Sequence, residues 1–387
     1  MRILEVFSLS SKNIGIYIHI PFCSNKCFYC DYASVITKNN SMVENYFKSL
    51  NKEIDLYDLK NKSIKTIYIG GGTPSYVEFE YIKNIIEKIS QKFDISGLKE
   101  FTIEMNPENV EDNLLRKYKE LGINRISLGA QSTNNKILKT VNRNNNEEIL
   151  IKAINKVSKF FENYNCDFIL GLPGENRLTV ENNLDFITKY KPPHVSYYIY
   201  DNNHESVLNR MIKHKKIIMP QHEKVEEYAD LIYDYFEKNG YKRYEISSWA
   251  IFDKESLHNK IYWENSEYIG FGVSAGGYYN STRYVNTKNF SYYIEKIQNY
   301  EKPYEYFKIN NKKENLIESF FMGLRLMKGI PLLKIKNDYP EYLEKILIFL
   351  KNDDLFEIDD NIKLSRKGID YSSRAFEKIL EMGDELP

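Results

Sequence analysis

The sequence predicts an α/β protein built on a parallel β-sheet, and three observations support this fold class. From about residue 14, short β-branched or aromatic runs alternate with longer stretches of helical spacing, as in repeated strand–helix units. Polar or glycine-rich motifs directly follow several of these runs. The 387 residues suffice for one large domain, with or without a smaller companion. Such repetition is compatible with either an open doubly wound sheet or a barrel.

Six runs qualify as strands, and two of the stretches between them predict amphipathic helices. The helix after Ser41 spaces Ser41 and Glu44 as a capping box, and a second helix follows the fourth strand. The strand candidates are residues 15–20, 64–69, 101–105, 125–130, 167–170 and 194–200. The apolar faces are Val43, Phe47, Leu50, Ile54 and Tyr57 in the first helix, and Leu150, Ala153, Ile154, Val157 and Phe161 in the second.

The pattern changes after residue 240, and we predict three parts: 1–240, 241–305 and 306–387. The middle part contains YEISSWA, HNKIYW and the glycine-rich run IGFGVSAGGYYNSTRY, and we expect it to close the open side of the sheet. The last part is helical from about Asn315 and then predicts strand, turn, strand and helix. That order favours a small winged-helix-like domain.

Charge and composition exclude several classes of partner. The 54 basic and 54 acidic residues cancel, so no excess charge favours nucleic acid or an anionic membrane surface. No apolar stretch is long enough to span a bilayer, and residues 1–13 lack the features of a signal peptide. We expect a soluble, cytoplasmic protein. Four cysteines argue against a disulfide framework, and we expect the isolated Cys166 to be a core residue.

The other cysteines form the motif Cys23-x3-Cys27-x2-Cys30 directly after the first strand. Thiolates at such spacings suit an iron–sulfur cluster. A four-iron, four-sulfur cluster held by three thiolates leaves one iron open to a chelating ligand such as S-adenosylmethionine. The alternatives are a zinc site completed by Asp31 or His19, or three buried thiols.

Five motifs follow the first five strands, and they should therefore meet at the carboxyl-terminal edge of the sheet, where ligands bind. Glu104 and Asp167 can accept hydrogen bonds from an ammonium or hydroxyl group, Gln131 offers a polar amide, and Arg143 can pair with a carboxylate. Taken singly, each fits a cap or a surface position equally well. The motifs are the cysteine loop, Gly70–Pro74, Asn106-Pro107, Gln131-Ser132 and Gly171–Gly174.

The segment HNKIYW brings His258, Asn259, Tyr262 and Trp263 into six residues. Imidazole is a common axial ligand of haem iron, and aromatic rings pack against planar faces. The segment is therefore a candidate haem element. The alternative is a loop whose aromatic residues pack on the barrel while His258 faces solvent.

The ordered motifs resemble those of radical SAM proteins related to oxygen-independent coproporphyrinogen III oxidase, and most closely those of the HemW-type haem chaperones. The resemblance implies a partial (β/α)6, TIM-like barrel that carries the cluster and S-adenosylmethionine, followed by a smaller C-terminal α+β domain of the winged-helix type. The motifs are YIHIPFCSNKCFYCDY, YIGGGTPS, TIEMNPE, NRISLGAQS, DFILGLPGE, YEISSWA and HNKIYW, from residue 17 to residue 263.

The resemblance also assigns residues by matching positions. It gives Cys23, Cys27 and Cys30 to the cluster and makes HNKIYW the haem-binding element. It gives to the S-adenosylmethionine region Tyr17, Tyr29, Gly71, Gly72, Thr73, Glu104, Gln131, Arg143 and Asp167. It assigns no catalytic residue.

Departures from the family pattern separate two functions. The oxidase branch usually has a further cysteine where Tyr32 stands, and a long arm where only 22 residues precede Cys23; both differences resemble the chaperone branch. The chaperones usually have a histidine soon after Arg143, where Asn144 to Asn146 stand, and another in GFGVSAGG. We expect a chaperone that binds haem and transfers it to an unidentified acceptor protein. The alternatives are a radical SAM enzyme acting on a tetrapyrrole, as an oxygen-independent coproporphyrinogen III oxidase or a haem-directed methyltransferase, and a zinc-stabilised barrel without redox function.

Overall fold

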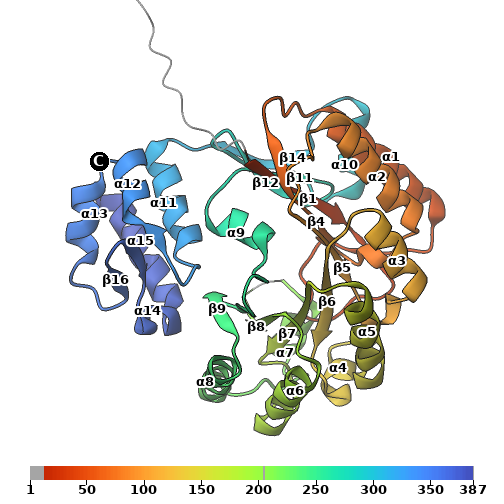
Figure 1. Cartoon of the computed structure of the whole chain (residues 1–387), viewed down its shortest axis with the longest axis horizontal. Coiled ribbons are helices and arrows are strands. Elements are labelled where there is room, and N and C mark those ends of the chain that lie inside the picture. Colours follow the sequence, from red (N-terminus) through yellow and green to blue (C-terminus); the bar gives the residue numbers. More distant parts are fainter. Residues whose placement is uncertain (1–12, 204, 387) are drawn as a thin grey trace, which may run out of the picture.

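The computed structural model describes residues 13–203 and 205–386, and its centre is a 12-stranded sheet (Figure 1). Six neighbouring strands of this sheet run parallel. Each overlaps one of the predicted strands, so the predicted α/β class is confirmed. They are β1 (Asn13–Ile20), β4 (Ser63–Gly71), β5 (Glu100–Met105), β6 (Arg125–Gln131), β7 (Tyr164–Leu170) and β8 (His194–Ile199).

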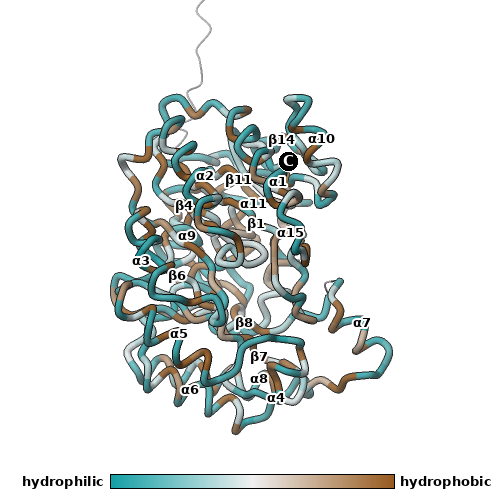
Figure 2. The backbone as a smooth tube through the Cα atoms, turned by 90° about the vertical axis from the view of Figure 1, so that its right-hand side faces the viewer, coloured by the Kyte–Doolittle hydropathy of each residue, from teal (hydrophilic) through white to brown (hydrophobic). Residues whose placement is uncertain are grey.

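Helices cover the outer side of these strands (Figure 1). The two predicted helices are α1 and α5, but the predicted capping box of α1 is wrong. The helix begins at Asn40, and the side chain of Asn39 accepts hydrogen bonds from Ser41 N at 3.1 Å and Met42 N at 3.3 Å. The helices are α1 (Asn40–Asp55), α2 (Phe79–Lys92), α3 (Asp112–Glu120), α4 (Asn135–Thr140), α5 (Glu147–Phe160), α6 (Arg177–Tyr190) and α8 (His222–Lys238). A further short helix, α7 (Val207–Lys213), projects from the body (Figure 2).

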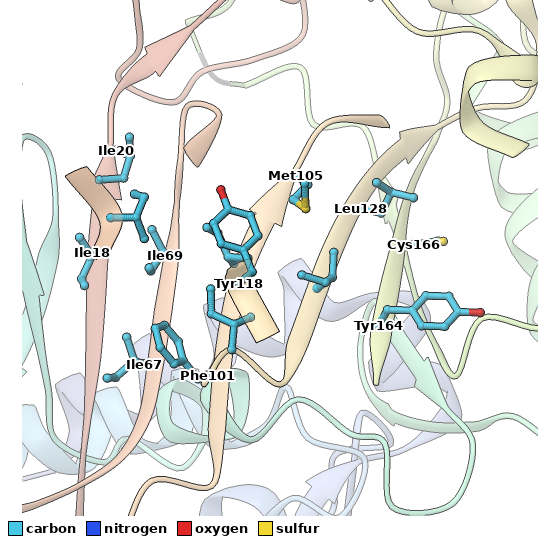
Figure 3. Packing of buried hydrophobic residues seen from close by; sticks show 14 of the residues in the cluster. Ile18, Ile20, Ile67, Ile69, Phe101, Met105, Tyr118, Leu128, Tyr164 and Cys166 are labelled. Carbon is cyan, nitrogen blue, oxygen red and sulfur yellow. The ribbon is translucent and has the colours of Figure 1, made fainter. Parts of the chain in front are cut away.

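Alternate residues of the parallel strands face the helices and form the main hydrophobic core. Ile18, Ile67, Phe101 and Leu128 lie across four neighbouring strands (Figure 3), and none is more than 1% exposed. Cys166 belongs to the same layer and is fully buried. The prediction that Cys166 is a core residue is therefore confirmed.

The other set of alternating residues faces the inside of the curved sheet and is polar. These side chains bond to one another between strands: Tyr68 donates to Glu104, and Ser127 donates to Asp167. A parallel sheet covered on both sides is usually apolar on both faces, so a polar inner face is typical of one that binds a polar ligand. The set includes Tyr17, His19, Thr66, Tyr68, Glu100, Glu104, Arg125, Ser127, Asn165, Asp167, His194 and Ser196.

The residues after 240 extend the sheet at both of its edges. Strand β10 (Ser248–Ala250) pairs antiparallel with β8, and β9 (Lys242–Glu245) lies beyond it. Strand β11 (Tyr268–Phe271) pairs parallel with β1 at the other edge. The connection between these edges is helix α9 (Leu257–Trp263), which carries HNKIYW (Figure 1). Beyond β11 lie β12 (Gly276–Tyr279), β13 (Thr282–Asn286) and β14 (Tyr304–Ile309), with α10 (Phe290–Gln298) between the last two.

The C-terminal residues have their own hydrophobic cluster, which includes Leu316, Phe320, Ile346 and Ile379. Their helices and small three-stranded sheet agree with the winged-helix-like expectation, and they lie beside α9 (Figure 1). Within the described ranges, no helix is long and apolar enough to cross a bilayer. The elements are α11 (Lys312–Gly323), β15 (Ile330–Pro331), α12 (Leu332–Asp338), α13 (Leu343–Leu350), β16 (Phe356–Ile358), β17 (Asn361–Leu364), α14 (Arg366–Asp370) and α15 (Ser372–Glu385).

Glu53 joins α1 to the extension. Its carboxylate is fully buried and accepts hydrogen bonds from Gly272 N at 2.7 Å, Asn286 Nδ2 at 2.6 Å and Tyr293 OH at 2.7 Å. Burial raises the pKa of Glu53 to about 7 despite these three donors. One side chain therefore holds together the loop after β11, strand β13 and helix α10.

We expect Glu53→Gln to lower the free energy of unfolding by about 2 kcal/mol, because one amide cannot accept all three hydrogen bonds. The pKa of Glu53 is raised on folding from 4.5 to about 7, so the wild-type group favours folding most below the lower value and loses that contribution as pH rises through the upper one. Urea unfolding between pH 5 and 8, chosen to bracket that pKa, should show this dependence in the wild type and not in the variant.

Glu44→Gln is the matched control, because Glu44 lies on the same helix and its side chain is 53% exposed. Its ion pair with Lys48 is on the surface, so its loss should change stability by less than about 0.5 kcal/mol. Equal stability of the two variants would contradict the assigned role of Glu53.

Candidate functional site

The cysteine loop lies between β1 and α1, at the carboxyl-terminal edge of the parallel strands. Cys23 ends β2 (Phe22–Cys23), which pairs in parallel with β3 (Val35–Ile36). Phe28 N donates to Val141 O at 2.9 Å, and Asn142 Nδ2 donates to Lys26 O at 2.9 Å. The loop is thus fixed to the segment that follows α4.

Each of the three cysteine sulfurs accepts a hydrogen bond from a different side chain. Two of the donors are cations, which favour the thiolate over the thiol, and hydrogen bonds to sulfur tune the potential of a bound cluster. The pairs are Thr73 Oγ1 to Cys23 Sγ at 3.5 Å, Arg143 Nη1 to Cys27 Sγ at 3.6 Å, and Lys26 Nζ to Cys30 Sγ at 3.9 Å. This set of donors fits three thiolates that together hold one iron–sulfur cluster.

Two of the three thiols, those of Cys23 and Cys30, are poor acids in this loop. Burial raises the pKa of Cys23, and it raises that of Cys30 to about 11. Coordination to a metal deprotonates a thiol outright, so these side chains fit a site in which metal binding, and not an intrinsically low pKa, produces the thiolates.

The alternative of a zinc site completed by His19 or Asp31 has no support in the structure. His19 Nδ1 lies 3.0 Å from Tyr17 OH and His19 Nε2 lies 2.8 Å from Ala33 O, so both ring nitrogens are engaged. Asp31 is exposed. In the described part of the chain, no group of three or more His, Cys, Asp or Glu side chains is placed to hold a single metal ion.

The glycine turn after β4 packs directly against the start of the cysteine loop. Gly72 N donates to Ile20 O at 2.8 Å, and a Cβ on Gly72 would lie only 2.9 Å from that oxygen. Gly71 has a φ of 110°, and a Cβ there would lie 2.5 Å from the ring of His19. Glycine is required at both positions by backbone conformation and close packing, in addition to any approach by a ligand.

Two half-buried carboxyl groups lie on the inner face below this turn. Glu104 accepts hydrogen bonds from Tyr68 OH at 2.7 Å and Gly71 N at 3.0 Å, and burial raises its pKa to about 7. Asp167 accepts from Ser127 Oγ at 2.9 Å, and burial raises its pKa as well. A ligand with positive charge would favour the ionised forms of both groups.

Arg143 is placed between the cysteine loop and the strand ends. Its Nη2 donates to Asn106 Oδ1 at 2.8 Å and to Gly129 O at 2.7 Å. Gln131 ends β6 with a left-handed φ of 65°, and Tyr29 packs in a small cluster beneath the loop. The guanidinium of Arg143 therefore connects Asn106 and Gly129 at the carboxyl-terminal edge of the sheet and also contacts Cys27.

His258 lies at the other end of the inner face, near the starts of the strands. Its Nδ1 is 2.6 Å from Thr66 Oγ1, its Nε2 is 2.7 Å from Tyr262 OH, and its ring stacks on Tyr68. Glu100, the first residue of β5, accepts a hydrogen bond from His258 N at 2.9 Å and so caps α9. The alternative in which His258 faces solvent is wrong, because the side chain is fully buried.

The four residues predicted to bind haem do not share one surface. His258 and Tyr262 point into the barrel, whereas Trp263 packs against Tyr244 and Ala250 with the Arg325 guanidinium 5.2 Å from its ring centroid. Asn259 N donates to Ser256 Oγ within the helix. The segment thus links the barrel interior to the C-terminal residues.

Several polar residues of the site were not predicted. Lys26 and Asn106 lie inside motifs that the sequence analysis recognised. Their roles could not be predicted, because the contact of Lys26 with Cys30 and that of Asn106 with Arg143 are visible only in the structure. Tyr68 alternates with buried isoleucines, a signal that would have placed it on the inner face. Glu100 and Arg125 are the first residues of β5 and β6, far from the carboxyl-terminal edge of the sheet, and no sequence signal distinguishes them.

Comparisons with known proteins agree with this geometry. The family model described as the radical SAM superfamily matches residues 17–187. The heme chaperone HemW of Lactococcus lactis subsp. lactis (strain IL1403) is 32% identical over 371 residues, which cover 94% of this chain and 96% of the relative. The heme chaperone HemW of Bacillus subtilis (strain 168) is 29% identical over 374 residues, 96% of each chain.

The solved structure of coproporphyrinogen III oxidase (HemN) from Escherichia coli, described as a radical SAM enzyme, has the same fold. It superposes with a TM-score of 0.81 and 20% identity, covering 96% of this chain and 90% of that one. At that identity the likeness concerns the fold alone. The identity to the Lactococcus lactis protein extends over nearly the whole of both sequences, and the chain therefore belongs to the family of the heme chaperone HemW.

Proposed function

We propose that this protein is a cytoplasmic haem chaperone, which binds haem and transfers it to an acceptor protein. The proposal includes a four-iron, four-sulfur cluster on Cys23, Cys27 and Cys30, with S-adenosylmethionine as an exchangeable ligand. The observation that carries the cluster is the separate donor that each of the three sulfurs has. Family membership supports the haem function, because the curated relatives are heme chaperones.

The residues around the sulfurs would hold and tune the cluster. When bound, it supplies an open iron site and the capacity for electron transfer. Lys26 and Arg143 place positive charge beside Cys30 and Cys27, and Thr73 donates to Cys23. The cations offset the negative charge of the thiolates in a loop that is mostly half-buried.

The inner face beside the cluster loop would hold S-adenosylmethionine. Glu104 and Asp167 offer half-buried carboxylates for its positively charged groups, while Gly71 and Gly72 bring the backbone close. The assignment of Tyr17, Tyr29, Thr73, Gln131 and Arg143 to the same region stays a prediction. Thr73 and Arg143 already contact the sulfurs, so their part would include the cluster.

The assignment of haem to HNKIYW also stays a prediction. For His258 to ligate haem iron, the hydrogen bond to Thr66 or the one to Tyr262 must break. Because α9 is capped by Glu100 from β5, exposure of His258 also requires part of the helix to leave the barrel.

We expect Cys27→Ala to abolish cluster assembly. After anaerobic reconstitution, the wild type should contain about four iron and four sulfide per chain, as one cubane requires, and the variant close to none. Iron and sulfide analysis together with the visible absorption spectrum measures this. Cys166→Ala is the control, because Cys166 is buried in the core and should leave the iron content unchanged. Full iron content in Cys27→Ala, or zinc in place of iron in the wild type, would contradict the cluster.

We expect Glu104→Gln to weaken S-adenosylmethionine binding by about tenfold or more, as loss of a buried charge-assisted contact does. The pKa of Glu104 is about 7, so below that pH a cationic ligand must first displace a proton. Wild-type affinity, relative to that of the variant, should therefore rise with pH up to about 7 and then level off. Equilibrium dialysis from pH 6 to 8.5, which brackets that pKa, measures both, with Glu80→Gln on the surface as control.

The haem function is tested on the reconstituted wild type by two assays. We expect haem to bind in an absorbance titration, and we expect no increase of 5′-deoxyadenosine when coproporphyrinogen is added. Turnover that depends on coproporphyrinogen would instead identify an oxidase and would overturn the chaperone proposal.

A further inference from the structure

A cleft of about 660 Å³ lies between the sheet extension and the C-terminal helices. One wall is formed by β12 to β14, including Gly276, Val285 and Tyr306, and the other by Phe321 of α11 and Leu380 of α15. A volume of this size is within the ~300–1,000 Å³ typical of small-molecule sites. The cleft is separate from the cysteine loop and contains part of the glycine-rich run, for which the proposed function gives no role.

Part of each wall suits a flat apolar ligand, while charged residues line the rest of the cleft, including Arg283, Lys308, Glu314, Glu318 and Asp384. Gly276 adds no side chain to its wall, and a Cβ there would meet no atom closer than Tyr284 O at 3.7 Å. Aromatic and aliphatic groups of Tyr306, Phe321 and Leu380 line the same space. Exposed backbone and flat rings on opposite walls leave room for a planar macrocycle and provide apolar contact with its faces.

The cleft also offers a cation for a ligand carboxylate. Lys308 is paired with Glu314 at 2.8 Å, whereas the guanidinium of Arg325 lies against aromatic rings and interacts electrostatically with Glu245. It is held between two aromatic rings, 5.2 Å from the centroid of Trp263 and 5.3 Å from that of Phe376. An arginine fixed in this way loses little freedom when it binds a carboxylate.

We propose that this cleft is the haem site, with the macrocycle between Gly276 and Phe321 and a propionate on Arg325. The inference rests on the proposed haem function and assigns a place to it. It also gives a different role to HNKIYW, because Trp263 of that segment positions Arg325 from outside the cleft, while His258 stays in the barrel with both ring nitrogens engaged.

The experiment compares three flat ligands on the full-length, reconstituted protein. Haem is titrated by absorbance, and iron-free protoporphyrin IX and its dimethyl ester are titrated by fluorescence. The ester lacks the charged carboxylates, so it separates recognition of the propionates from recognition of the ring. The variants are Gly276→Leu, which fills the cleft from its open wall, Arg325→Leu, which removes the cation, and His258→Ala.

Arg374→Leu is the matched control. Arg374 lines a second cavity of about 600 Å³ within the C-terminal residues, where it lies with Asp353 and Asp354. That cavity is lined mainly by charged and polar groups, with Tyr371 as its one aromatic residue. Thermal melting of each variant shows whether it is folded before its affinity is compared.

We expect Gly276→Leu to weaken all three ligands by at least about tenfold, because it occupies the space of the ring. Arg325→Leu should weaken haem and protoporphyrin about tenfold but leave the dimethyl ester unchanged, which a merely structural role of Arg325 would not produce. His258→Ala and Arg374→Leu should bind like the wild type. Wild-type affinity in both cleft variants, or loss of haem only in His258→Ala, would overturn the cleft and leave the chaperone proposal intact, whereas no haem binding by the wild type would overturn both.

Discussion

The two-residue period of six parallel strands is the constraint on which the rest of the structure depends. Successive side chains of a strand point to opposite faces, so Ile67 and Ile69 pack under the helices while Thr66 and Tyr68 face inward. A slip of one residue in any strand would place isoleucines on the inner face and carboxyl groups in the core. The apolar outer face supplies stability, and the polar inner face costs some of it. That cost is reduced because many inward groups, such as Thr66, Tyr68 and Ser127, form hydrogen bonds with residues of other elements.

The inner face has two ends with different roles. At the carboxyl-terminal end, loops bring the cysteines and Arg143 together. At the other end, α9 crosses between the two edges of the sheet and is held by Glu100 through backbone N–H groups. Burial lowers the pKa of His258 to about 3, so its ring is neutral at physiological pH. The ring fills this end of the inner face and is hydrogen-bonded to Thr66 and Tyr262. Tyr68 spans the distance between the ends, since it stacks on His258 and donates to Glu104.

Much of the fold could be predicted from the sequence, because strands, turns and amphipathic helices have local signatures. The six strands and the position of the cysteine loop depend on such signals. The cap of α1 was misplaced because Asn39 and Ser41 are both residue types that cap helices, and the sequence does not show at which of them the helix begins. The burial of His258 could not be predicted, since it depends on Thr66, almost two hundred positions away in the chain.

The three sulfur donors show why the cluster loop and the barrel must form together. Thr73 comes from the turn after β4, Arg143 from the segment after α4, and Lys26 from the loop itself. A short loop could place three cysteines near one another by itself, but it could not supply two of these three donors. The charge around the sulfurs is therefore set by the register of β4 and by the position of Arg143 on Gly129 O. Sequence spacing alone predicts the ligands, whereas the folded sheet determines the electrostatic environment of the three cysteines.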